Sequence, residues 1–437
     1  MKQLFLIEDS LSNKISYYHL VCFLVALPFD RFYSELVLIS FVIHTLLHLT
    51  WDRVKRVLSR EVIIVSAVYL VGLLSLIYSS EKKQALTEAF IQVALVLFPV
   101  TLTCNSLDLK KYKWPLLKIF GYTCTIAVAY LYIDALLTIW YFHLPFTSLF
   151  EAAFMNQNFS APIEMHATYL SMYVAFSICN FLVCCSKKEA AINRIFYFIC
   201  MMVLTAALLQ LSSRAVGIAL LLIIFFIFPL SLFGKKRKML VAGIAAAGVV
   251  IVFAVIQQNN AFRERYFSEL QKDLSPYTNN IEVTEPRMVR WKAAMELVRE
   301  SPVIGYGSGS EVALLKEKYF DHKLYSSYLH QFNAHNQYIS LLIKTGIPGL
   351  LIYLSVLIYG LMIAWKKRDL SFAAFMVLLT VTSMSENILD LNKGIFFYSF
   401  FFSFFLLVNK KAGLRETASL SGNQSPALDD YTSQGMK

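Results

Sequence analysis

Two arginines and one histidine are the residues of this sequence whose types and placement best suit chemistry. Arg214 closes the short hairpin Gln210-Leu-Ser-Ser-Arg214 between two apolar segments, with no carboxylate within ten residues on either side. A guanidinium without a neighbouring acid is suited to bidentate contact with a phosphate or pyrophosphate. The alternative is that this side chain only extends to lipid phosphates at a membrane surface.

Arg287 is predicted to begin a helix, because Pro286 suits the first turn. Helical spacing places apolar residues on the same face, namely Trp291, Ala294 and Val298. A buried arginine in a first helical turn needs an anion, and the helix N-terminus favours the same anion. That anion could be a ligand or an acidic side chain such as Glu386. Arg290 lies further round the helix and could help to position a substrate.

His335-Asn336 directly precedes an apolar segment over residues 337–364 that contains Gly346-Ile-Pro348-Gly349. A helix of that length would measure about 42 Å, against about 30 Å for the hydrocarbon core of a bilayer, so we predict a break or kink at Pro348. His335 would then lie at the start of a helix, whose positive end favours the neutral imidazole that a general base requires. A structural role is the alternative for a lone histidine. Asn336 beside it could position a substrate.

Four more polar residues are expected at the same face. Glu164 and His166 open the predicted span 163–184, and Glu386 and Asp390 close a later one. Either pair could position a substrate or neutralise an arginine. Helix capping and solvation at the membrane interface explain them equally well.

The composition is that of a polytopic membrane protein. Hydrophobic residues make up 57% of the 437-residue chain and charged residues 16%, which leaves too little polar surface for a soluble domain of this size. Segments of roughly 20 apolar residues can cross a bilayer. Twelve are predicted, over residues 15–30, 33–50, 62–79, 86–104, 116–141, 163–184, 195–212, 215–233, 239–256, 337–364, 370–386 and 394–409. We therefore expect an all-α membrane protein of about twelve transmembrane helices.

The predicted spans divide the chain into four parts. Residues 1–256 hold the first nine spans, residues 257–336 form one long polar loop that we expect to be mainly helical, and residues 337–410 hold the last three spans. Residues 411–437 are rich in small polar residues and are predicted to be a disordered cytoplasmic tail.

Positive charge indicates the orientation of the bundle. If the N-terminus is cytoplasmic, alternate short loops carry nineteen Lys and Arg residues, against five in the opposite short loops. This asymmetry predicts that both termini are cytoplasmic and that the 257–336 loop lies on the outer face, together with Arg214. The net charge of +11 is then mainly a topology signal and not the footprint of a nucleic acid.

No cofactor and no metal site is expected. None of the seven cysteines lies in the 257–336 loop, and that loop has no cluster of carboxylates. His44 and His48 share one helical face, which a helix contact explains better than a metal. The glycines of Gly305-Tyr-Gly307-Ser-Gly309 follow no predicted strand, so they indicate a turn that allows close backbone packing and not a nucleotide loop.

The chain resembles the O-antigen ligase and polymerase family of bacterial envelope glycosyltransferases in four motifs, which occur in the same order around a long outer loop. The motifs are Leu-Ser-Ser-Arg214-Ala, Pro-Arg287-Met-Val-Arg-Trp291, Ser-Pro-Val-Ile-Gly305-Tyr-Gly307-Ser-Gly, and His335-Asn336-Gln-Tyr with the later Gly346-Ile-Pro-Gly-Leu. The resemblance covers roughly residues 160–410, and the first five spans match only in hydropathy. It implies a C-type glycosyltransferase-like fold in the bacterial inner membrane.

The resemblance also implies a metal-independent, inverting transfer at the periplasmic face. The donor would be a glycan on undecaprenyl pyrophosphate, and the acceptor would be a sugar hydroxyl, of lipid A-core for a ligase. Arg214 and Arg287 would hold the pyrophosphate, and His335 would activate the acceptor hydroxyl. The chemistry agrees, because a pyrophosphate can leave without acid catalysis once cations neutralise its charge.

Other functions share parts of this pattern. A polysaccharide polymerase or a protein O-oligosaccharyltransferase of the same family would use the same donor site and differ in the acceptor. A carrier or flippase for lipid-linked sugars would need cationic residues through the depth of the bundle, whereas this sequence places them at one face.

Overall fold

The computed structural model describes residue 4, residues 6–187 and 189–229, a few positions between 243 and 254, and residues 256–274 and 285–410. Throughout these residues the regular structure is helical, as the sequence predicts. The longer helices are α2 (Leu11–Ala26), α3 (Arg31–Leu47), α5 (Arg60–Ser75), α6 (Lys82–Ile91), α7 (Ala94–Cys104), α8 (Lys113–Tyr141), α10 (Ala167–Cys185), α11 (Ala191–Leu211), α12 (Arg214–Leu222), α20 (Gln337–Lys367), α21 (Leu370–Thr382) and α22 (Asn392–Val408). The tail over 411–437 and most of the predicted ninth span lie outside the described residues.

Helices α10, α21 and α22 form the centre of the bundle. The rings of Phe397, Phe401 and Phe405 on α22 pack against Phe176 of α10 and Phe375 of α21. Nearly all side chains of α22 are buried. A helix that is apolar on every side is expected at such a central position, so this aromatic core explains why the C-terminal segment is so rich in phenylalanine.

Several helices have the length and composition of membrane spans. Five are long and apolar enough, namely Lys82–Cys104, Lys113–Tyr141, Ala167–Cys185, Ala191–Leu211 and Gln337–Lys367. The bent pair Trp51–Leu58 and Arg60–Ser75, with 52° between its halves, would add a sixth. Three further apolar helices are shorter, namely Arg214–Ile227, Leu370–Thr382 and Asn392–Val408. The described part therefore has the character of a helical membrane protein, and the count of twelve spans stays a prediction.

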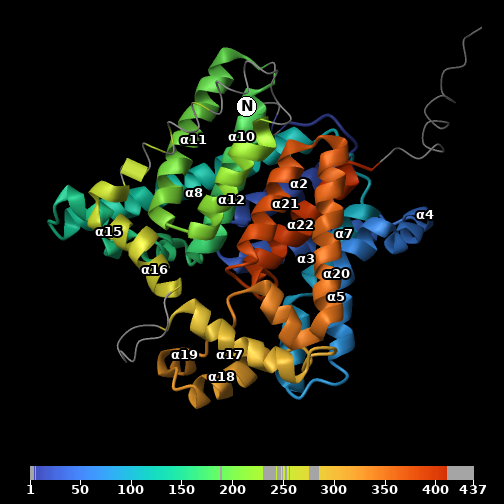
Figure 1. Ribbon diagram of the computed structural model, residues 1–437. Coiled ribbons are helices and arrows are strands. Elements are labelled where there is room, and N and C mark those ends of the chain that lie inside the picture. The colour runs from blue at the N-terminus through green and yellow to red at the C-terminus, as the bar shows by residue number, and fades with distance from the viewer. Residues whose placement is uncertain are drawn as a thin grey trace, which may run out of the picture.

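Three helices of the long polar segment, α17 (Arg287–Glu300), α18 (Glu311–Asp321) and α19 (Tyr325–Leu329), pack together across one end of the bundle (Figure 1). Their shared core includes Leu297 of α17 and Tyr319 of α18, and it continues to Ile343 of α20. We call this end of the bundle the loop end. It lies at the bottom of Figure 1.

Helix α20 is broken at Gly346, which has a φ of 66° and a ψ of −161°. The sequence predicts the break at Pro348, and the prediction is wrong by two residues for a physical reason. Pro348 has no N–H to donate to the carbonyl of Lys344, four residues earlier. Instead the N–H groups of Tyr306 and Gly307 donate to the carbonyls of Ile343 and Lys344, each at 2.8 Å.

The glycine-rich turn makes this close packing possible. A Cβ on Gly305 would lie 2.5 Å from the carbonyl oxygen of Ile343, and a Cβ on Gly346 would lie 2.1 Å from that of Val303. Both glycines have positive φ, which other residues rarely adopt. The turn therefore has the close-packing role that the sequence predicts, and it fixes α17 and α18 against the start of α20.

Candidate functional site

His335 pairs with Glu386 at the loop end. The Nδ1 atom of His335 lies 3.3 Å from Oε2 of Glu386, which belongs to the link between α21 and α22. A carboxylate accepts a hydrogen bond, so it places the proton of the neutral ring on Nδ1 and leaves the Nε2 lone pair open. In the described part of the chain, Nε2 has no hydrogen-bond partner. The ring is thus arranged to accept a proton at Nε2.

Glu386 is held in its ionised form. Burial alone would raise the pKa of this carboxyl group, but the hydrogen bond and charge of His335, followed by the charges of His166 and Arg287, lower the pKa below its ordinary value. The hydroxyl of Thr168 donates a further hydrogen bond to Oε1 at 3.3 Å. An ionised Glu386 can therefore both orient His335 and stabilise its imidazolium form.

The loop that carries His335 is fixed on both sides. The side chain of Asn336 caps α20 by accepting from the N–H groups of Tyr338 and Ile339. The backbone N–H of Asn336 donates to Asn387, at 2.8 Å, and that of Ala334 donates to Glu311, at 2.9 Å. Asn336 is therefore a positioning residue by its contacts, and His335 itself has a φ of 45°, which such a tightly held loop can impose.

Arg214 and Arg287 meet at a single carboxylate. Arg214 Nη2 lies 2.5 Å from Oδ2 of Asp273, and Arg287 Nε lies 4.0 Å from the same oxygen. Arg287 Nη1 also donates to the carbonyl of Ser385, the residue before Glu386. Arg287 makes no ion pair with Glu386, the acid that the sequence suggested as its partner. Two guanidinium groups that share one carboxylate retain a net positive charge next to the His335–Glu386 pair.

Buried N–H groups at this cluster lack partners. Arg214 Nη1 and Arg265 Nε are both buried and form no hydrogen bond with described residues. Arg265 pairs with Glu269 through another nitrogen. Arg214 and Arg265 thus each have a hydrogen-bond donor that the described residues leave unused.

Arg265 is a site residue that the sequence reasoning missed. Its sequence context offers no signal, because it is one of ten Lys and Arg residues in a loop with ten acids. Its charge nevertheless helps to lower the pKa of His166, after desolvation and together with His335 and Arg287, while Glu386 opposes the shift. Arg265 therefore lies within electrostatic reach of His166, which in turn interacts with Glu386.

A comparison with protein families agrees with this geometry. Residues 196–354 match the family described as O-antigen ligase. The chain carries an O-antigen ligase family domain. No curated protein sequence matches the chain closely enough to add a relative. The match indicates a bacterial membrane enzyme of the O-antigen ligase and polymerase type, with a lipid-linked glycan and an acceptor as its general partners.

The matched segment contains five of the predicted site residues, and four of them, Arg214, Arg287, His335 and Asn336, have been placed above. The fifth, Arg290, packs with its guanidinium 5.1 Å from the ring centroid of Phe332. Phe332 in turn packs edge-on against His335. Arg290 thus packs against the site through Phe332 and also lies within electrostatic reach of Arg287 and Asp273, and its buried Nε has no partner within the described residues.

Glu164 and His166 precede α10, outside the matched segment. His166 caps this helix, because its Nδ1 accepts from the N–H of Thr168 at 3.3 Å. Glu164 is exposed and has a φ of 51°. His166 therefore has the helix-capping role that the sequence suggested as one of its alternatives. It does not exclude a second role, since His166 also interacts electrostatically with Glu386.

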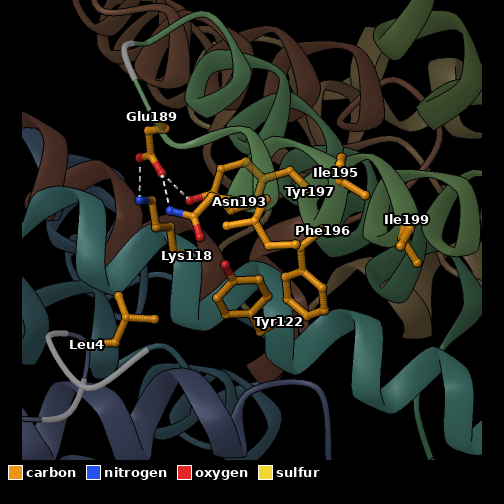
Figure 2. A pocket seen from close by; sticks show the side chains of 10 residues that line it. Leu4, Lys118, Tyr122, Glu189, Asn193, Ile195, Phe196, Tyr197 and Ile199 are labelled. Carbon is orange, nitrogen blue, oxygen red and sulfur yellow. Dashed lines mark hydrogen bonds and ion pairs between the residues drawn. The ribbon is translucent and has the colours of Figure 1, made fainter.

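One large cavity lies away from these residues. It has a volume of about 560 Å³ and is lined by Tyr122, Phe196, Lys118 and Glu189, among others. Figure 2 shows Lys118, Asn193 and Tyr197 directed at Glu189, and these groups satisfy one another through ion pairs and hydrogen bonds. The cavity lies along the first half of α11, and Arg214 follows the opposite end of this helix, which is about 30 Å long. It offers no free acid, base or cation for transfer chemistry.

The described residues contain no group of three or more His, Cys, Asp or Glu side chains that could hold a metal ion. The free groups at the loop end are instead guanidinium groups and an imidazole. Their chemistry suits a reaction in which negative charge develops on a leaving group and a hydroxyl loses its proton.

Proposed function

We propose that this protein is a glycosyltransferase that moves a glycan from undecaprenyl pyrophosphate to a sugar hydroxyl, as an O-antigen ligase does with lipid A-core. The observation that carries the proposal is the juxtaposition of two chemical groups at the loop end. A histidine oriented by Glu386 lies beside two arginines that share the carboxylate of Asp273. A base and an anion clamp side by side are what the transfer requires.

The transfer is one displacement at the anomeric carbon. Nε2 of His335 takes the proton of the acceptor hydroxyl, whose oxygen forms the new bond to that carbon. The bond from the carbon to the pyrophosphate oxygen breaks, and its electron pair leaves with the pyrophosphate. Arg214 and Arg287 neutralise the added charge, so that neither a general acid nor a metal is needed, and the anomeric configuration inverts.

The position of the cations distinguishes this proposal from a lipid-linked sugar carrier. A carrier needs polar groups that a substrate can follow through the membrane. Here Arg214, Arg265 and Arg287 gather at one end of the bundle. A polysaccharide polymerase and a protein O-oligosaccharyltransferase share this donor chemistry, and no described contact favours either acceptor over lipid A-core.

Reconstitution tests the proposal. Purified protein should transfer glycan from an undecaprenyl-pyrophosphate donor to a lipid A-core glycolipid, and transfer should persist in EDTA because arginines neutralise the leaving group. Loss of transfer in EDTA with recovery on adding Mg²⁺ would contradict the roles of Arg214 and Arg287. Movement of intact donor across a vesicle without any new glycosidic bond would instead support a carrier.

A further inference from the structure

A second cavity opens at the loop end. It has a volume of about 260 Å³, and its polar lining includes Asp30, Arg31, Glu164, His166, Asn392 and Lys393. These residues come from the starts of three helices, α3, α10 and α22, or directly precede them. The sequence treated most of them only as loop charges or as helix caps.

The cavity adjoins the proposed base. His166, in its wall, is followed by Thr168, whose hydroxyl donates to Glu386. Tyr169, also in the wall, donates through its hydroxyl to the backbone carbonyl of Asn387, at 3.2 Å. The contact of Tyr169 thus joins the wall of the cavity to the link that holds Glu386 against His335, and Asp390 and Leu391 of this link line the cavity themselves.

The arginine cluster borders a different side of this link. Arg214, Arg265 and Arg287 do not line the cavity. In Figure 1, α16 (Glu269–Leu274), which carries Asp273, lies to one side of α12, and α3 and α22 lie to the other. In an inverting displacement the acceptor approaches the anomeric carbon opposite the leaving group. A donor pyrophosphate on the arginines therefore directs the acceptor towards the side of this cavity.

The lining suits a sugar better than a simple anion. Arg31 and Glu164 are exposed and have no partner among the described residues, whereas Nδ2 of Asn392 already donates to Glu35. Lys393 donates to the carbonyls of Leu27 and Phe29. Acceptors, donors and both signs of charge in one small cavity match the many hydroxyl groups of a saccharide, each of which donates and accepts.

The family match separates this cavity from the donor machinery. Arg214, Arg287 and His335 lie within residues 196–354, whereas every residue that lines the cavity lies outside that segment. A family that shares a donor and differs in acceptors would have its common chemistry in the shared segment. The residues that select the acceptor would then lie elsewhere in the chain.

We propose that this cavity holds the acceptor saccharide, and that Arg31 and Glu164 bind its hydroxyl groups and set acceptor specificity. The inference rests on the proposed function, because it takes His335 as the base and the arginines as the donor site. It assigns a binding role to the start of α3, the most N-terminal part of the site.

The test separates acceptor binding from donor binding and from chemistry. Arg31→Ala and Glu164→Gln are compared with wild type and with Lys83→Ala, a matched loss of an exposed cation that does not line the cavity. Initial rates are measured at varied acceptor concentration with saturating donor. They are then measured at varied donor concentration with saturating acceptor. The acceptors are a lipid A-core glycolipid without O-antigen and the lipid-free core oligosaccharide released from it.

Each cavity variant should raise the acceptor KM by about tenfold, the value of one hydrogen bond to a charged group. The donor KM and the kcat at saturating acceptor should stay near wild type, and the defect should persist with the lipid-free oligosaccharide. An unchanged acceptor KM in both variants, or an equal rise in the donor KM, would overturn the inference while the proposed function stands. A wild-type protein that transfers to neither acceptor would overturn both.

Discussion

The Nδ1 atom of His335 lies 3.3 Å from Oε2 of Glu386, although the two residues are 51 positions apart in the chain. This contact determines which ring nitrogen can act. With Nδ1–H directed at a carboxylate, Nε2 is the proton acceptor, and the negative charge stabilises the imidazolium that forms. Glu386 thus makes His335 an oriented base, and separate variants can distinguish orientation, charge and proton transfer.

His335→Ala should lower the transfer rate by at least roughly 10²-fold, the usual loss for a general base. Donor binding should be nearly unchanged, because a neutral imidazole adds little to pyrophosphate affinity. Single-turnover transfer and direct donor binding measure the two effects. His322→Ala is the matched control, since His322 is exposed on the same polar segment and, among the described residues, its side chain pairs only with Glu296. Full activity in His335→Ala would eliminate it as the base, and a donor-binding defect would assign it to the anion site.

Glu386→Gln keeps a hydrogen-bond acceptor for Nδ1 but removes the charge. The kcat should fall by about tenfold to a hundredfold, as expected for loss of a charge-assisted hydrogen bond, while the donor KM changes little. A kcat equal to wild type would show that Glu386 does not assist His335.

The same variant tests stability against pH. The folded-state pKa of Glu386 is below its ordinary value of 4.5, so its ionised form stabilises the fold above that value, and this contribution is lost as pH falls through the folded pKa. The advantage of wild type over Glu386→Gln in unfolding temperature should be full at neutral pH and should shrink only below pH 4.5. An advantage that grows on acidification would contradict the ionised assignment.

The sequence identifies the reactive residues better than their partners. Arg214, Arg287 and His335 stand out because they are polar residues at the ends of apolar segments or of an amphipathic helix. Their partners do not, since contacts such as Arg214 to Asp273, 59 positions apart, depend on how the helices pack. The sequence considered Glu386 a partner for Arg287, and packing instead gives it to His335.

The break in α20 likewise combines a feature that the sequence predicts with one that only the fold shows. Pro348 correctly predicts that the helix is interrupted, because it cannot donate to the carbonyl of Lys344. Only the fold shows that the N–H of Gly307 takes that place and that the non-helical residue is Gly346. The missing N–H of Pro348 therefore predicts that the helix is interrupted, and tertiary packing determines which residue has the non-helical backbone.

Arg287→Ala should impair donor binding and catalysis together, because the pyrophosphate is charged before the reaction and gains charge as the bond breaks. Arg287→Lys should recover only part of the activity, since a point charge replaces a planar fork poorly. The donor KM and the single-turnover rate measure both effects. Arg299→Ala, an exposed arginine on the same helix, is the control. Full recovery in Arg287→Lys would mean that net charge alone is needed.

Cysteine labelling tests the orientation on which a periplasmic reaction depends. Asp321→Cys and Lys323→Cys place exposed thiols near α18 at the loop end, and Asp52→Cys and Ser186→Cys place them in the short basic loops. In a cysteine-free background and with the outer membrane permeabilised, an impermeant maleimide should label only the first pair, because Lys and Arg residues hold their loops in the cytoplasm. The second pair should react only after the inner membrane is opened. Labelling of the second pair alone would place His335 in the cytoplasm, where a reaction at the periplasmic face could not use it.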